Sequence, residues 1–162
     1  MPRVIIPIRA VPKARARHTS INGIHRSYTP KTTAKFEQTI KHEIEKLKLK
    51  PSDKPISLSV TFTFKLPDSS PKYYSENINY IAHTVKPDLD NLLKSIKDAM
   101  NRVAWLDDAQ VVDTLMSKFY GSDDYIVISW HETKNLVCPK GKRKDTVLAE
   151  IKNIQKKAIN YE

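Results

Sequence analysis

The stretch Ile56-Ser57-Leu58-Ser59-Val60-Thr61-Phe62-Thr63-Phe64 decides the fold. Apolar side chains alternate with serine and threonine along all of it. Because successive side chains of a β-strand point to opposite faces of the sheet, the alternation predicts a half-buried strand. The fold therefore contains a sheet with one buried face, and the neighbouring segments pack against that face.

Two helices flank this strand in the sequence. The first is predicted from Thr29-Pro30 to about Lys50, where Pro51 stops it. The second starts near Asp90 and carries an apolar stripe on one side. The stripes consist of Phe36, Ile40, Ile44 and Leu47 in the first helix, and of Leu92, Leu93, Ile96, Ala99, Met100 and Val103 in the second.

Shorter elements are predicted toward the N-terminus. Residues 4–8 form an apolar run in which Pro7 marks the edge or the end of a strand. Residues 12–18 are basic, lack a hydrophobic period and indicate a loop. Residues 21–28 favour a small hairpin around Asn22-Gly23.

The C-terminal half completes the predicted fold. Residues 111–120 and 125–131 indicate two strands joined as a hairpin by the turn 121–124, and residues 146–159 indicate a helix. The polar residues 67–75 indicate a loop. The fold class is therefore α+β (mixed α/β): a single domain with a mixed β-sheet of about four strands packed against helices.

The composition limits the classes of protein. The chain has 162 residues, 40% of them hydrophobic, and no apolar run approaches the ~20 residues that span a bilayer. Residues 1–7 lack the apolar region of a secretory signal, so a cytoplasmic location is expected. The single cysteine, Cys138, excludes an internal disulfide and a cysteine-based zinc cage.

The charge is distributed unevenly. The net charge is +10, and residues 1–50 contribute +9 of it, from 12 Lys/Arg against 3 Asp/Glu. Residues 81–130 hold 5 Lys/Arg against 8 Asp/Glu, a net of −3, and residues 131–162 hold 8 against 4, a net of +4. Basic flanks favour contacts with a polyanion such as nucleic acid, and the alternative is a solvated surface.

The acidic centre contains a candidate metal site. Pro87 favours an extended Lys86, so Asp90 is the expected N-cap of the second helix, with Asp88 two residues earlier in extended backbone. Side chains two apart in extended backbone point to one side, so both carboxylates can meet one ion. Magnesium takes one or two protein carboxylates and keeps several waters.

A third carboxylate and a cation complete the candidate site. Asp107 or Asp108 is placed to contribute the carboxylate, and Lys94 lies one helical turn after Asp90, where it can stabilise charge on a phosphate. Structural alternatives remain open for every member. Asp90 can be a helix cap, Lys94 can pair with Asp90 or Asp98, and Asp107-Asp108 can form a turn. Asp98 can be a surface residue, and His83 can be a structural histidine.

The longer motif resembles one family. Residues 86–94 (KPDLDNLLK), 97–101 (KDAMN) and 105–112 (WLDDAQVV) are similar to the RusA family of Holliday junction resolvases, small endodeoxyribonucleases frequently carried by phages and prophages. The resemblance covers about residues 3 to 132. Arg102 departs from it, because many relatives have a glycine there.

The resemblance implies a function and a set of residues. It implies a homodimer that cuts four-way DNA junctions with magnesium, manganese being an acceptable substitute, in the cytoplasm of a bacterial host cell. It assigns metal binding and catalysis to Asp88, Asp90 and Asp108, and an assisting role to Lys94. The alternative is a non-catalytic protein that binds branched DNA.

The resemblance also frames the rest of the chain. Residues 1–135 are expected to form the nuclease domain, and residues 136–162 a basic linker and helix within or appended to it. Tyr73, Tyr74 and Tyr80 are candidates for stacking on DNA, although packing is the more common role. The cations expected to hold backbone phosphates are Arg9, Lys13, Arg15, Arg17 and Arg26.

Overall fold

Strand β4 (Ile56–Lys65) lies inside the sheet of the computed structural model, which describes residues 1–14, 17–21, 24–28, 30–78, 81–134, 136–137 and 141–159. The sheet has the order β1-β6-β4-β5, with β1 (Arg3–Ile6), β5 (Val111–Gly121) and β6 (Tyr125–Glu132). β4 pairs parallel with β5 and antiparallel with β6, and β6 pairs antiparallel with β1. The predicted α+β domain with a four-stranded mixed sheet is confirmed.

The predicted hairpin between β5 and β6 is wrong. The two strands are consecutive in sequence, but β4 is inserted between them. The turn after β5 therefore crosses the end of β4, where Leu66 N–H donates to the Gly121 carbonyl and Lys65 N–H donates to the Asp124 carboxylate. A side chain at Gly121 would meet the Thr63 methyl group at 2.3 Å, so this crossing requires glycine.

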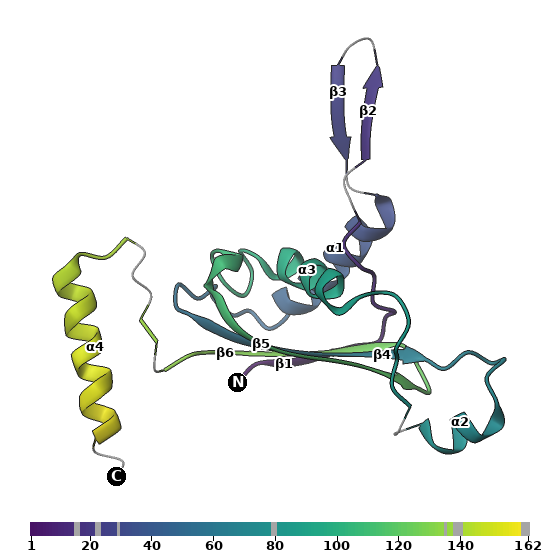
Figure 1. Ribbon diagram of the computed structural model, residues 1–162. Helices are drawn as coiled ribbons and strands as arrows, with labels where there is room; N and C mark the ends of the chain where they lie inside the picture. Colours follow the sequence, from purple (N-terminus) through teal and green to yellow (C-terminus); the bar gives the residue numbers. More distant parts are fainter. Residues whose placement is uncertain are drawn as a thin grey trace.

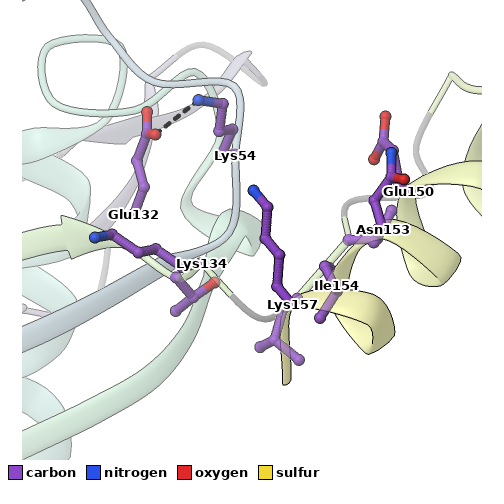
Figure 2. Close-up of a pocket in the computed structure, with 10 residues that line it drawn as sticks. Lys54, Glu132, Lys134, Glu150, Asn153, Ile154 and Lys157 are labelled. Atoms are coloured by element: carbon purple, nitrogen blue, oxygen red, sulfur yellow. Dashed lines mark hydrogen bonds and ion pairs between the residues drawn. The ribbon is translucent and has the colours of Figure 1, made fainter. Parts of the chain in front are cut away.

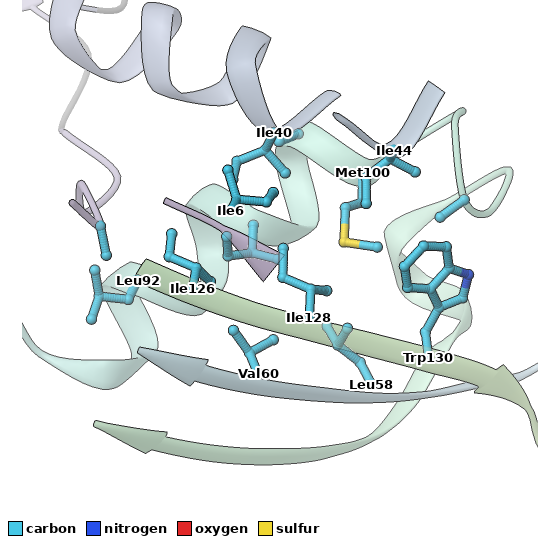
Figure 3. Close-up of a cluster of buried hydrophobic side chains, with 14 of the residues drawn as sticks. Ile6, Ile40, Ile44, Leu58, Val60, Leu92, Met100, Ile126, Ile128 and Trp130 are labelled. Carbon is cyan, nitrogen blue, oxygen red and sulfur yellow. The ribbon is translucent and has the colours of Figure 1, made fainter. Parts of the chain in front are cut away.

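One face of the sheet carries the core. The apolar residues of β4, from Ile56 to Phe64, are each no more than 1% exposed. Helices α1 (Lys31–Glu45) and α3 (Leu89–Met100) lie on this face (Figure 1), and Figure 3 shows side chains from both layers pointing toward one another. The predicted stripes supply the helical part, through Phe36, Ile40, Ile44, Leu92, Ile96, Ala99 and Met100.

Helix α1 ends at Glu45, five residues before the predicted end. Leu47, the last residue of the predicted apolar stripe, is 37% exposed. The stripe therefore no longer packs against the core at this point. The chain leaves the helix through a turn in which Lys48 has φ of 51°. Pro51 therefore follows the turn and does not end the helix itself.

Three smaller elements refine the prediction. The hairpin is confirmed as a separate two-stranded sheet of β2 (Arg17–Ile21) and β3 (Ile24–Tyr28), which stands away from the main sheet (Figure 1). Its first strand starts inside the segment predicted as a basic loop. The predicted polar loop 67–75 contains the short helix α2 (Lys72–Glu76).

The C-terminal helix α4 (Lys144–Ile159) is confirmed, beginning two residues before the predicted start. A hollow of about 1000 Å³ separates it from the end of β6, and Figure 2 shows lysines and glutamates around it. None of the aspartates singled out above lines this hollow. Among the helices of the described residues, none has the length and apolar character that crossing a membrane requires.

Candidate active site at the ends of helix α3

Asp88 and Asp90 lie at the N-terminal end of α3. Asp88 occupies the N-cap position in extended backbone (φ −75°, ψ 147°), and Asp90 lies in the first helical turn, so the prediction that Asp90 is the N-cap is wrong. Asp88 makes no side-chain capping hydrogen bond. Both residues are exposed. The positive end of the helix dipole favours carboxylates here, and their oxygens face water.

Asp88 lines a hollow of about 460 Å³. Phe64, near the end of β4, and Asn91, one position after Asp90 on α3, also line this hollow. Arg9, Lys13 and Lys86 also line this space, so a negatively charged group would meet cations here. The hollow is therefore a suitable place for a phosphate beside the two carboxylates.

A lysine on the sheet supports the segment that leads into Asp88. The Lys118 ammonium, from β5, donates to the carbonyl oxygens of Val85 at 2.6 Å and of Pro87 at 2.8 Å. Both hydrogen bonds carry a full charge on the donor and are of the stronger kind. Lys118 thus fixes the backbone from which the Asp88 side chain projects.

The two other acids lie at the opposite end of α3. Asp107 is the N-cap of a short 3-10 helix, η2 (Asp108–Gln110), in a complete capping box with Gln110. Its carboxylate accepts from Ala109 N–H at 3.0 Å, and its own N–H donates to the Gln110 side chain at 2.8 Å. Asp107 therefore has a structural role.

Asp108 is placed differently from its neighbour. Its side chain is 46% exposed, and its carboxylate lies 3.9 Å from the Lys97 ammonium on α3. Lys97 is two helical turns beyond Asp90, or about 10 Å along the axis. Within one chain, Asp108 therefore belongs to the far end of α3 and not to the Asp88–Asp90 end.

The three aspartates do not form one cluster. Among the described residues, no three histidine, cysteine or acidic side chains are grouped so that they could hold a metal ion. Asp88 and Asp90 by themselves fit magnesium, which binds through one or two carboxylates and retains water. The fit concerns the pair, because Asp108 is not grouped with Asp88 and Asp90 in the described part of the chain.

Lys94 lies on the exposed side of α3, one turn after Asp90. No ion pair of Lys94 is found in the described part of the chain, so the predicted pairing with Asp90 or Asp98 is absent there. Asp98 is instead held by Lys13 at 2.6 Å, which corrects the prediction that it is a surface residue without a second element to meet.

The residues expected to bind phosphates have different positions. Lys13 lies between Glu37 and Asp98, each at 2.6 Å. Burial alone would lower the pKa of Lys13, but the hydrogen bonds from its ammonium to Asp98 and Glu37 raise it above the ordinary value. Lys13 therefore joins α1 to α3, and its charge is already compensated.

Arg9 is 62% exposed, pairs with Asp124 at 3.3 Å and lies 5.5 Å from the centre of the Phe64 ring. It remains accessible at the mouth of the hollow. Arg15 lies outside the described residues. Arg17 and Arg26 belong to β2 and β3, where the structure describes the backbone and not the side chains.

His83 is a buried histidine, 4% exposed, packed between Phe64 and Tyr120 with ring centres 4.1 Å and 4.7 Å away. Burial lowers its pKa, and the charges of Lys118 and Arg9 lower it further. Within the described residues, His83 belongs to no group of three or more side chains that could hold a metal ion. The structural interpretation of His83 is therefore the appropriate one.

The remaining candidates add little to this site. Tyr73 and Tyr74 pack edge to face on α2, with ring centres 4.6 Å apart. Tyr80 and Cys138 lie outside the described residues.

Comparison with known proteins now identifies the family. The family described as Endodeoxyribonuclease RusA matches residues 7–129, which are 123 of the 162 residues. The chain belongs to the RusA family. A curated relative, "Uncharacterized protein YqaN" of Bacillus subtilis (strain 168), is 34% identical over 82 residues. The matched region covers 48% of this chain and 58% of that relative, so the chain spans little more than half of the relative's length.

The RusA match begins directly after β1 and runs through most of β6. It includes both ends of α3, whereas α4 lies beyond it. Sequence reasoning missed two residues in this region, Lys118 and Lys97. A signal for Lys118 was present in the sequence, where it alternates with Met116 and Tyr120 along the predicted strand. The structure aligns it with Phe62 of β4, on the face that carries the core. A lysine on the core-facing side of a strand indicates a buried hydrogen-bond acceptor or a functional site nearby.

Proposed function

We propose that this RusA family member is a structure-selective DNA endonuclease that resolves four-way (Holliday) junctions by magnesium-dependent hydrolysis of phosphodiester bonds. The observation that carries the proposal is the pair Asp88 and Asp90. Both carboxylates are exposed at the positive end of α3, and Asp88 opens on a hollow lined by Arg9 and Lys86. Acids within a basic surface are expected where a cation must meet a polyanion.

Each residue has a defined part in this proposal. Asp88, Asp90 and Asp108 would hold magnesium, with manganese as a substitute; the bound ion would supply an acidified water and neutralise charge on the phosphate. Lys94 would donate to the phosphate oxygens as negative charge increases on them. Arg9, Arg15, Arg17 and Arg26 would contact the DNA backbone, and Lys118 would keep the Asp88 backbone in place.

The proposal includes the assembly and the location. A two-fold homodimer would present two sites to matching strands of a junction. Residues 1–135 would form the nuclease domain, and residues 136–162 a basic appendage. The cytoplasm of a bacterial host is the proposed location.

A second candidate is a protein that binds branched DNA without cutting it. The absence of a three-acid cluster within the described residues of one chain favours this candidate. The exposed carboxylates oppose it, because Asp88 and Asp90 would repel phosphates unless a cation neutralised them.

Cleavage of a synthetic four-way junction with and without magnesium separates the two candidates. The Asp90→Asn protein should bind the junction with unchanged affinity and cut it more than about 100-fold more slowly, since loss of even an indirect metal contact costs 10- to 100-fold. Asp68→Asn is the matched control, because the Asp68 side chain is 91% exposed in a loop. Equal cleavage by both variants would remove Asp90 from the mechanism.

A further inference from the structure

Helix α4 stands away from the rest of the fold, and the side that faces the hollow between α4 and β6 is polar. Figure 1 shows the helix beyond the end of β6, across the hollow of about 1000 Å³. Four of its residues line that hollow at the spacings i, i+3, i+4 and i+7, which place them on one face of a helix. They are Glu150, Asn153, Ile154 and Lys157. Three of the four are polar, so this face is unsuited to packing against a hydrophobic core.

The apolar residues of α4 do not close the hollow. Leu148 is 43% exposed and Ile151 is 38% exposed, and neither of them lines it. A helix that only extended the core would turn these two side chains toward the sheet. The hollow is therefore open to a polar ligand, and the charges of its lining residues indicate which kind.

The two glutamates of the hollow are already paired with cations. Glu132 accepts from the Lys54 ammonium at 2.8 Å and from the Ser52 hydroxyl at 2.7 Å. These two hydrogen bonds lower the pKa of Glu132 below its ordinary value. Both carboxylate oxygens of Glu150 accept from the Lys142 ammonium at 2.8 Å. The negative charges of the hollow are therefore compensated within the chain.

Two lysines of the hollow supply a surplus of positive charge. Lys134, two residues after β6, lines it from the sheet side, and Lys157, in the last turn of α4, lines it from the helix side. Neither lysine has an ion pair within the described part of the chain. Figure 2 shows the Lys157 side chain extending from α4 into the space before the sheet. Two accessible ammonium groups at one opening are suited to the phosphate groups of a polyanion.

The surroundings of the hollow favour DNA as that polyanion. Residues 131–162 hold 8 Lys/Arg against 4 Asp/Glu, a net of +4. The hollow lies beside the start of β4, whereas the hollow lined by Asp88 lies near the end of the same strand, at Phe64. At about 3.3 Å per residue, Ile56 and Phe64 are about 26 Å apart. A contact at α4 would therefore hold DNA at a distance from the Asp88 carboxylate.

We infer that the hollow between α4 and β6 binds the sugar-phosphate backbone of a DNA arm, with Lys134 and Lys157 contacting its phosphate groups from two sides. The inference rests on the proposed function and adds a second DNA contact to it. This contact lies outside the region of the family match, which ends at residue 129. The two lysines hold the substrate and take no part in the cleavage step.

The salt dependence of DNA binding tests the inference. Each phosphate contact that is lost should reduce the steepness of log K against log salt concentration by about 0.9 for duplex DNA. The double variant Lys134→Gln, Lys157→Gln should therefore reduce it by about 1.8 and weaken binding at least about tenfold near 0.1 M salt. Fluorescence anisotropy of a labelled four-way junction and of a labelled duplex, without divalent cations, measures binding in the absence of cleavage.

The double variant Lys41→Gln, Lys46→Gln is the matched control. It removes the same charge from two exposed lysines, each paired with a glutamate of α1, and should leave the slope unchanged. Lys134→Arg with Lys157→Arg should keep the wild-type slope, because guanidinium groups also bind phosphate. Equal slopes for the wild type and the Lys134, Lys157 glutamine variant would overturn the inference and assign the hollow to another ligand. An equal loss in the α1 control, or a loss for duplex RNA without one for duplex DNA, would overturn it as well.

Cleavage kinetics separate this contact from the active site. The glutamine variant of Lys134 and Lys157 should show a raised KM for the junction with kcat unchanged, because it loses binding that is equal in the ground state and the transition state. A fall in kcat with KM unchanged would place the two lysines in the reaction and refute the inference. A wild type that binds junctions with the expected salt dependence but cuts none would refute the proposed function and leave this inference standing.

Discussion

The two ends of α3 carry the same residue type in opposite circumstances. At the N-terminal end, Asp88 and Asp90 are exposed, and the backbone before them is held by Lys118. At the C-terminal end, Asp107 is engaged in the capping box of η2, and Gln110 continues the network to the carbonyl oxygens of Ser52 and Lys54, in the segment before β4. Asp107 is thus used for folding, whereas Asp88, Asp90 and the half-exposed Asp108 remain available for chemistry. Substitutions should separate the two uses.

The largest effect is expected from Lys118→Met at the N-terminal end. The change removes two charge-assisted hydrogen bonds to the Val85 and Pro87 carbonyl oxygens. Because Asp88 follows directly, affinity for Mn²⁺ should fall about 10- to 100-fold, as for other groups that orient metal ligands. Calorimetric titration with Mn²⁺ measures this.

Lys118→Arg is the conservative control, since it keeps a cation that can donate to the same carbonyl groups. It should recover a substantial part of the affinity. If Lys118→Met bound Mn²⁺ as tightly as the wild type, the backbone before Asp88 would be fixed by other contacts.

At the C-terminal end, Asp107→Ala should act on stability. It deletes the carboxylate that accepts from Ala109 N–H and so should lower the free energy of unfolding by about 1 kcal/mol, within the range for lost N-caps. Asp108→Ala should cost less than about 0.5 kcal/mol, because its contact with Lys97 is 3.9 Å long and partly exposed. Urea denaturation of both variants makes the comparison, and an equal loss for the two would contradict it.

A smaller effect of the opposite sign is expected from Arg102→Gly. Arg102 follows α3 with φ of 64°, in the left-handed region that favours glycine, and its N–H donates to the Trp105 carbonyl at 2.7 Å. Relief of this conformation should raise the free energy of unfolding by about 0.5–1 kcal/mol, because part of the gain is offset by the greater freedom of glycine when unfolded. Arg102→Ala separates the loss of the side chain from the gain in backbone freedom and should not stabilise.

The sequence predicted those features that depend on neighbouring residues. The alternation in β4 and the stripe of α3 are local patterns, and both lie in the core as expected. The insertion of β4 between β5 and β6 depends on contacts between distant segments, and no local pattern records it. The same limit applies to the site: the motif identified the aspartates, but the distance of Asp108 from Asp88 follows from the direction of α3 and from the place of η2.

The smallest effect concerns His83, which packs between Phe64 and Tyr120. Its pKa is lowered by burial and by the charges of Lys118 and Arg9, so the imidazole takes up a proton less readily in the folded chain than in the unfolded chain. Between that lowered pKa and the ordinary value of about 6.5, the unfolded chain binds more protons than the folded chain. The free energy of unfolding should therefore decrease as the pH falls below about 6.5.

His83→Phe tests this directly, because phenylalanine preserves an aromatic ring between Phe64 and Tyr120 but cannot take up a proton. Its free energy of unfolding should fall less steeply than that of the wild type as the pH is lowered, when both are measured by urea denaturation at several pH values. The same replacement at His131, exposed at the end of β6, is the control for the loss of a histidine. Equal pH dependence of His83→Phe and the wild type would mean that the fold accommodates a protonated His83 between Phe64 and Tyr120.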